Sequence, residues 1–138
     1  MSLLSAIVQK KRERLNFAKT KIPLKEMRSK VLEVEKPKNF KAALKREVGS
    51  IRLIAEIKKA SPLRGIIRQD FDLVSIALIY EKNAVDALSI LTEEDYFQGK
   101  LEYLLKAKDV TRKPLLRKDF IFDEYQIYES LVTGADAI

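Results

Sequence analysis

Short apolar runs alternate with amphipathic stretches from Ile51 onward, and this alternation limits the fold more than any other feature of the sequence. The runs are brief and rich in branched residues, as buried strands are. The expected strands are 52–58, 86–91, 114–118 and the start of a fourth at 135–138, and the expected helices are 73–83, 101–110 and 124–132. Strands that alternate with helices about every 30 residues indicate βαβ units and a parallel sheet.

The first 50 residues follow a different pattern, which is helical throughout. Apolar residues at helical spacing predict helices over 3–19 and 24–34, the first with a basic face opposite its apolar face. Asn39 can cap a third helix that ends at Gly49. We therefore expect two parts, a helical extension over 1–50 and a strand–helix part over 51–138.

The number of strand–helix units suggests an incomplete barrel. A closed (β/α)8 TIM barrel needs roughly 200 residues or more, and the 138 residues here hold three βα units and the start of a fourth strand. The expected fold class is therefore α/β, with about the first half of such a barrel. The segment 59–70, with Pro62 and Gly65, is expected to be a loop.

The first expected strand carries two charges that a buried strand should not carry without a reason. Glu56 and Lys58 are two residues apart, so their side chains share one face of the strand and can pair. They also lie at its C-terminal end, where parallel α/β folds place their active sites. An edge strand with a solvated ion pair is the alternative, and the sequence leaves both interpretations open.

The third expected strand also ends in a charged residue. Lys118 closes the third strand, and Phe120 follows it. Because the carboxyl ends of parallel strands meet at one rim, Glu56, Lys58 and Lys118 could face one pocket. Lysines that share a pocket suit a phosphate or carboxylate substrate, and a neighbouring cation or burial brings a lysine pKa towards the range of a proton donor.

Composition excludes several classes of site. The sequence has no histidine and no cysteine, so it has no Ser-His or Cys-His triad, no disulfide and no zinc site built on those ligands. Acid–base work falls to Glu, Asp, Lys or Tyr. The commonest nucleotide-binding glycine motifs are missing as well. Composition thus excludes metal sites that depend on cysteine or histidine ligands.

Charge is unevenly distributed along the chain. Residues 1–50 hold 14 Lys and Arg against 5 Asp and Glu, a net charge of +9, whereas residues 51–138 hold 13 against 15, a net charge of −2. A basic third can bind nucleic acid or an anionic substrate, or it can be a solvated helical face, which we favour. Without a zinc motif or an aromatic-and-glycine signature, nucleic acid is not an expected partner.

No apolar run approaches the length of about 18 residues that a membrane span requires. The charges at the N-terminus follow its short apolar segment rather than precede it, so we expect no signal peptide. The expectation is a cytoplasmic protein that does not contact membranes.

Four blocks of the sequence, in this order and spacing, resemble the indole-3-glycerol phosphate synthase family. They are A-E-I-K-K-A-S-P (55–62), S-I-L-T-E-E-D-Y-F-Q-G (89–99), P-L-L-R-K-D-F (114–120) and G-A-D-A-I (134–138). The resemblance implies a ribulose-phosphate-binding barrel and a reaction that needs no cofactor and no metal. In this reaction 1-(2-carboxyphenylamino)-1-deoxyribulose 5-phosphate closes its ring, loses carbon dioxide and water, and becomes indole-3-glycerol phosphate.

The resemblance also implies roles for individual residues. Lys118 takes the position of the general acid that protonates the substrate carbonyl oxygen. Lys58 matches a lysine that contacts anionic groups and assists later proton transfer, and Glu56 matches a glutamate of the same proton chemistry. The implied substrate-binding residues are Ser61, Pro62, Phe97 and Phe120.

Two departures from the family pattern affect these expectations. Leu63 stands where the family often has a second serine, and Arg64 follows it, which alters the loop after the first strand. The family's general base and its phosphate-binding loops are expected beyond residue 138. The chain by itself is therefore expected to be inactive or nearly so.

An alternative belongs to another class of protein. A half-barrel that exposes strand edges can associate with a missing C-terminal half or with itself, and act only as an assembly module. Sedimentation that depends on concentration, without turnover after the other half is added, would favour this alternative.

Overall fold

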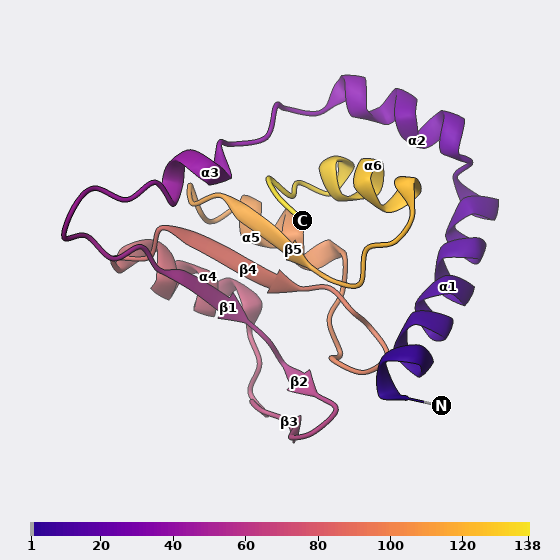
Figure 1. Cartoon of the computed structure of the whole chain (residues 1–138), viewed down its shortest axis with the longest axis horizontal. Coiled ribbons are helices and arrows are strands. Elements are labelled where there is room, and N and C mark those ends of the chain that lie inside the picture. The colour runs from indigo at the N-terminus through magenta and orange to yellow at the C-terminus, as the bar shows by residue number, and fades with distance from the viewer. Residues whose placement is uncertain (1) are drawn as a thin grey trace.

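A three-stranded parallel sheet forms the centre of the computed structural model, which describes residues 2–138. Its strands lie in the order β1 (Ile54–Ile57), β4 (Ala87–Leu91) and β5 (Leu115–Lys118) (Figure 1). Both neighbouring pairs are parallel, which confirms the predicted βαβ arrangement. The expected fourth strand is represented by a single parallel bridge between Leu116 and Ala137.

Two helices of the strand–helix part begin directly after a capping aspartate. Asp72 caps α4 (Leu73–Lys82), and Asp123 caps α6 (Glu124–Val132). Gln126 completes a capping box on α6, so side chains satisfy backbone N–H groups in both directions. The third helix, α5 (Glu102–Lys108), lies within the range expected for it.

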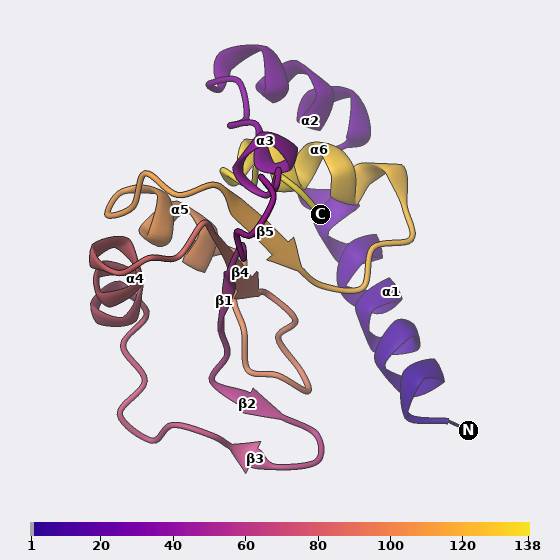
Figure 2. The ribbon, with the colours of Figure 1, turned by 60° about the vertical axis from the view of Figure 1, so that its left-hand side comes forward.

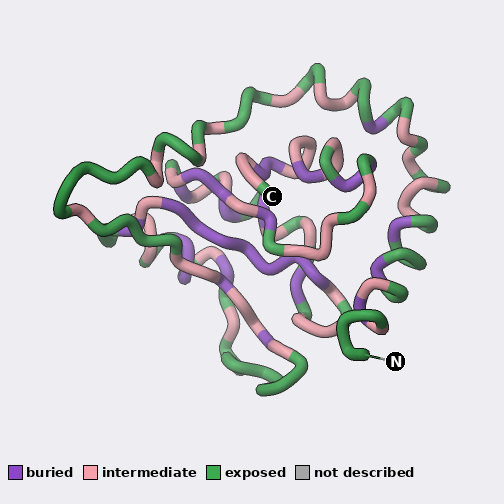
Figure 3. The backbone as a smooth tube through the Cα atoms, in the orientation of Figure 1, coloured by how far each residue is buried: buried purple, intermediate pink, exposed green. Residues whose placement is uncertain are grey.

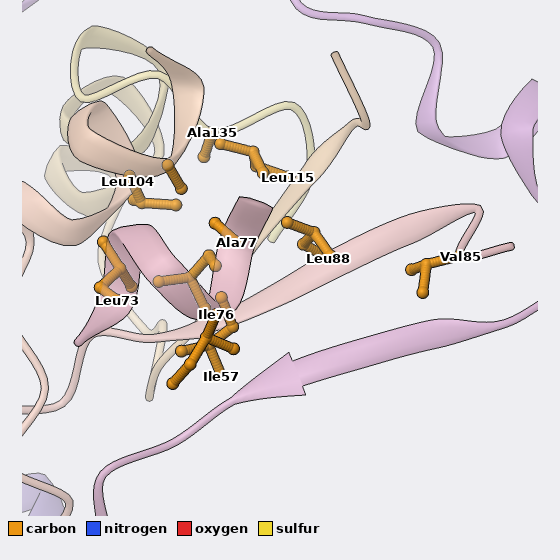
Figure 4. Close-up of a cluster of buried hydrophobic side chains, with 11 residues drawn as sticks. Ile57, Leu73, Ile76, Ala77, Val85, Leu88, Leu104, Leu115 and Ala135 are labelled. Carbon is orange, nitrogen blue, oxygen red and sulfur yellow. The ribbon is translucent and has the colours of Figure 1, made fainter. Parts of the chain in front are cut away.

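Helices α4 and α5 pack on one face of the sheet (Figure 2). Alternate residues of each strand point into this layer, and buried side chains of the helices meet them (Figure 4). The cluster consists of Ile57, Leu73, Ile76, Ala77, Val85, Leu88, Ile90, Leu104, Ala107, Leu115 and Ala135. Burial of each large aliphatic side chain contributes about 1.5–3 kcal/mol, so this layer holds the strands in place.

Strand β1 differs from the fully buried strand that its apolar run predicts. It is an edge of the described sheet, and it is shorter than expected. Leu53 and Ile54 are 51% and 42% exposed, and Ile57 is the buried residue that joins the core. An edge position leaves one side of the strand without a neighbour, which explains the exposure.

The segment expected as a loop after β1 contains an antiparallel hairpin. Strands β2 (Ala60–Ser61) and β3 (Gly65–Ile66) pair across a turn that projects from the sheet (Figure 1). Gly65 adopts a φ of 62°, a conformation that residues with a Cβ rarely adopt. Each strand has only two residues, and so short a pair leaves no alternating pattern to detect.

The N-terminal segment, residues 2–50, forms an arc around the sheet (Figure 1). It contains α1 (Leu3–Lys21), α2 (Leu24–Lys30), a 3-10 turn η1 (Val31–Glu33) and α3 (Phe40–Ala43). Ser2 and Asn39 cap α1 and α3 as the sequence allows. The helix expected to reach Gly49 ends at Ala43, because its side chains lie on a largely exposed stretch (Figure 3) and a short helix needs packing to persist.

Helix α1 buries only part of the face that its apolar residues predict. Leu3 and Leu4 are exposed, whereas Ile7, Lys11 and Leu15 are buried. Steps of four residues place these three on one side of the helix, so a lysine occupies the centre of the buried stripe. The expected basic face is present, with Lys10, Arg12 and Arg14 exposed, but Lys11 does not belong to it.

Basic side chains of the N-terminal segment pair with acidic side chains of the strand–helix part. The pairs are Lys11 with Glu94 and Asp119, Arg14 with Asp95, Lys19 with Asp123 and Arg28 with Glu124. Arg12 also lies over the ring of Phe122. These pairs use four of the 14 basic residues in this segment. Most of the others are exposed, as the solvated-face interpretation expects. In the part of the chain that the structure describes, no helix has the length and hydropathy to span a bilayer.

Gly99→Ala tests how closely the loop after β4 packs. A Cβ at Gly99 would lie 2.5 Å from the carbonyl oxygen of Leu91 and 2.8 Å from that of Glu93, both on backbone that cannot yield easily. We expect the free energy of unfolding in urea to fall by about 1–3 kcal/mol. The exposed neighbour Lys100→Ala is the control, and equal stability of the two variants would contradict the packing.

Candidate functional site

A cleft of about 590 Å³ lies at the C-terminal ends of β1, β4 and β5. It is on the face of the sheet opposite α4 and α5, because its strand residues alternate with those of the core. Register brings Glu56 beside Ser89, and Leu91 beside Lys118. The lining residues are Glu56, Lys58, Leu91, Phe97, Leu116, Arg117, Lys118, Asp119, Phe120 and Ile138.

The two charges of the first strand do share a face and form a pair. Nζ of Lys58 is 3.0 Å from a carboxylate oxygen of Glu56, and the side chains are 34% and 33% exposed. Ser89 donates a long hydrogen bond of 3.5 Å to the same carboxylate. An ion pair this accessible contributes only about 0–1 kcal/mol to stability, and both its ammonium and its carboxylate remain open to the cleft.

Lys118 ends β5 beside this pair. Its carbonyl oxygen accepts a hydrogen bond of 3.0 Å from the amide of Thr92, which fixes the backbone of β5 against β4. The residue is exposed, and among residues 2–138 no acidic side chain forms an ion pair with its ammonium. This ammonium is therefore available to an anionic or carbonyl group in the cleft.

Two aromatic rings line the same cleft. The centroids of Phe97 and Phe120 are 6.3 Å apart and the rings are tilted by 44°. Rings at this distance and angle can pack against a further aromatic group. The structure therefore brings together the predicted site residues Glu56, Lys58, Phe97, Lys118 and Phe120.

A buried carboxylate holds the loop that carries Phe97. Glu93 is fully buried, and its carboxylate accepts hydrogen bonds from the amides of Asp95, Tyr96 and Phe97. These donors offset the cost of burying its charge. Its neighbours Glu94 and Asp95 pair with Lys11 and Arg14, so this acidic cluster fits an ion-pair network rather than a metal site.

Ser61 and Pro62 lie apart from the cleft lining. Ser61 belongs to β2, where its hydroxyl accepts a hydrogen bond of 3.3 Å from the amide of Arg64. Leu63 is 92% exposed at the turn of the hairpin. A substrate-binding role for Ser61 and Pro62 stays a prediction, and it requires the hairpin to approach the cleft.

A buried ion cluster that the sequence patterns do not predict lies beneath the cleft. It consists of Lys11, Glu94, Arg117, Asp119 and Glu129. The Asp119 carboxylate accepts hydrogen bonds from Thr92 at 2.7 Å, Lys11 at 3.0 Å and Arg117 at 3.1 Å. Its side chain is fully buried, and those of Lys11 and Arg117 are 5% and 3% exposed. The spacing of Lys11 between Ile7 and Leu15 is the sequence signal that could have revealed it.

Arg117 extends this cluster into α6. Its guanidinium donates to Glu129 at 2.9 Å and to Ser130 at 3.0 Å, and it reaches the carbonyl oxygen of Gln126. Within residues 2–138, every buried side-chain nitrogen or oxygen has a hydrogen-bond partner. The cluster is therefore fully satisfied, which a charged group needs in order to stay buried.

The environment of Asp119 fixes its ionisation. Burial raises the pKa of its carboxyl, but the charges of Arg117 and Lys11 and the hydrogen bond from Thr92 outweigh burial and hold the pKa below its ordinary value. Asp119 is therefore ionised at neutral pH, where it can hold both cations.

Comparison with known proteins identifies what the chain is similar to. The family model for indole-3-glycerol phosphate synthase matches residues 4–138. A protein of that name from Alkaliphilus metalliredigens is 50% identical over 99% of this chain and 52% of its own length. One from Campylobacter jejuni strain 81-176 is 51% identical over 99% and 53%, and one from Chlorobium phaeovibrioides 49% over 100% and 54%. The chain spans about half the length of the curated relatives it matches.

Asp119→Asn should weaken the fold and flatten its acid dependence. An unfolded aspartate titrates near pH 3.9, and the folded pKa is lower, so the stabilisation is complete above that pH and disappears as pH falls through the folded pKa. We expect the variant to lose about 3 kcal/mol of unfolding free energy at pH 7.

The measurement is urea denaturation between pH 7 and pH 2.5, with Asp109→Asn as the control, because Asp109 is exposed. The slope of stability against pH below pH 4 should be shallower for Asp119→Asn than for the wild type. Identical slopes would show that Asp119 does not carry the acid dependence.

Proposed function

This chain belongs to the indole-3-glycerol phosphate synthase family, and we propose that its cleft carries the acid side of that synthase reaction. The fold of the family is a TIM barrel, and the parallel sheet described above agrees with part of one. The proposed substrate is 1-(2-carboxyphenylamino)-1-deoxyribulose 5-phosphate and the proposed product is indole-3-glycerol phosphate. The observation that carries the proposal is the exposed Lys118 ammonium at the end of β5, in one cleft with Lys58, Glu56 and two aromatic rings.

Ring closure is the step assigned to Lys118. The ring carbon that bears the carboxylate attacks the ribulose carbonyl carbon, and the carbonyl oxygen becomes a hydroxyl as Lys118 gives it a proton. The carboxylate then leaves as carbon dioxide, and its bonding electrons return to the ring. A general acid in position contributes about 10²–10⁴-fold to such a step.

Dehydration is the step assigned to Lys58 and Glu56. The new hydroxyl leaves as water once it receives a proton, and the ring nitrogen's electrons help to expel it. The CH2 carbon between the nitrogen and this centre then gives up a proton to the general base, and the electrons of that C–H bond form the C=C bond of indole. Lys58, 3.0 Å from Glu56, supplies an ammonium at the rim for this transfer and for contact with the substrate's anionic groups. Neither step takes electrons from an external reductant or gives them to an external oxidant, so the proposal requires no redox cofactor.

Phe97 and Phe120 are proposed to pack against the substrate's aromatic ring. Their tilted geometry leaves faces and edges that a planar ring can meet. Ser61 and Pro62 are proposed to line the substrate from the β2–β3 hairpin. The division into a helical extension over 1–50 and a barrel part over 51–138 is part of the same proposal.

A second candidate function is assembly without chemistry, and the edge strand β1 favours it. Leu53 and Ile54 are exposed at the free edge of the sheet, as they would be where another chain adds a strand. The partner would be a second copy or the segment that completes the barrel. A sedimentation coefficient that rises with protein concentration would support this candidate if Ile54→Lys abolishes the concentration dependence.

Turnover tests the enzymatic proposal. We expect indole-3-glycerol phosphate fluorescence to appear when the chain is combined with the C-terminal half of the Alkaliphilus metalliredigens relative. Lys118→Ala should lower kcat about 10²–10⁴-fold, whereas the exposed Lys100→Ala should leave it unchanged. Absence of turnover in a mixture that assembles, or full activity of Lys118→Ala, would overturn the assignment.

A further inference from the structure

Lys11 is a buried cation that the proposed chemistry does not use. It lies in the middle of α1 and is 4% exposed, although it belongs to a helix with many exposed charges. Its ammonium is 2.8 Å from Glu94 and 2.9 Å from Asp119. A buried ammonium costs free energy unless such partners surround it. The two ion pairs therefore hold α1 against Glu94 and Asp119.

Asp119 is the point at which three elements meet. Its carboxylate accepts from Lys11 on α1, from Thr92 after β4 and from Arg117 on β5. One carboxylate oxygen also accepts a hydrogen bond of 2.8 Å from the backbone amide of Phe120. A shift of α1 therefore acts on the backbone at the end of β5.

The neighbours of Asp119 in sequence are two residues of the cleft. Lys118 precedes it and Phe120 follows it, and both line the cleft. Asp119 lines the cleft with them, but its side chain is fully buried and is held by Lys11, Thr92 and Arg117. The buried carboxylate thus sets the direction of the residues on either side.

Stability alone does not account for this cluster. A buried ion pair is often no more stabilising than a well-packed apolar pair of similar volume. What a charge-assisted cluster adds is directional geometry, because each donor must aim at a particular oxygen. Geometry matters at a proton donor, since a displacement of about 1 Å can cost about 10²-fold in rate.

We propose that Lys11 is a positioning residue for the synthase site: acting through Asp119, it fixes the end of β5 so that Lys118 and Phe120 face the substrate. It does not touch the substrate. This inference rests on the proposed function for its kinetic readout, and it assigns to the N-terminal helix a role in the cleft beyond covering the sheet.

The test compares Lys11→Met, Lys11→Arg and Arg14→Met. Methionine keeps the length of the stem and removes the charge. The variant should fold, because Arg117 and Thr92 still hold Asp119, and Glu94 is 30% exposed and can be hydrated. Arg14→Met is the matched control, because Arg14 pairs α1 with Asp95 at the surface and, although it lies 4.0 Å from Glu94, forms no ion pair with Asp119.

In the active mixture, Lys11→Met should lower kcat about 10-fold or more while KM changes less than about 2-fold. Lys11→Arg should recover most of the loss, because it restores the charge. Arg14→Met should match the wild type. Activity of Lys11→Met equal to that of Arg14→Met would overturn the inference, even if the wild type is active.

A second readout does not need turnover. In the ¹⁵N-labelled chain, Lys11→Met should shift the amide signals of Lys118 and Phe120, and Arg14→Met should not. Thr92→Val, which removes one donor to Asp119 without leaving a charge unpaired, should shift the same amides. Unmoved signals in Lys11→Met and Thr92→Val would overturn the inference, whereas shifted signals without wild-type turnover would reject only the proposed function.

Discussion

The carboxylate of Asp119 is the interaction on which the rest of the arrangement depends. It lies between a helix from the start of the chain and two strands that end at the cleft, and all three supply it with donors. Arg117 carries the same cluster into α6. Because each buried charge is held by others, the cluster forms as a unit, and the N-terminal segment is tied to the sheet through its interior as well as through its surface.

The cleft follows from a simpler constraint, the alternation of side chains along parallel strands. Alternate positions of each strand divide between a core beneath α4 and α5 and an opposite face that carries both apolar and charged residues of the cleft. Charged residues at the strand ends then fall on this opposite face, where Lys118 and the Glu56–Lys58 pair meet. In the proposed chemistry, the same division keeps the proton donors away from the packed layer that supports them.

Much of this architecture could be predicted from the sequence, because local signals and the fold agree. Asp123 with Gln126 marks the start of α6 unambiguously, and the strands β4 and β5 occur almost where branched apolar runs predict them. The third N-terminal helix was predicted too long, since its spacing was right but no core receives its side chains. The β2–β3 hairpin was too short to leave a pattern.

The candidate site was predictable in its strand-end residues and not in the cluster beneath them. Glu56, Lys58 and Lys118 stand out because charges follow apolar runs. Asp119 and Arg117 look like further surface charges until α1 is placed, since their partner Lys11 is more than a hundred residues away from Asp119. Pairing over that separation is decided by tertiary structure, which no local pattern encodes.

Amide hydrogen exchange at Phe120 as a function of salt tests the central claim most directly. Exposed ion pairs are screened by salt, whereas buried ones are screened far less, and the Phe120 amide donates to the buried Asp119 carboxylate. The account predicts that protection of this amide changes less than about 3-fold between 0.05 and 1 M sodium chloride. Exchange at the rate of an unstructured amide in high salt would show that the cluster is a surface network and does not hold the cleft.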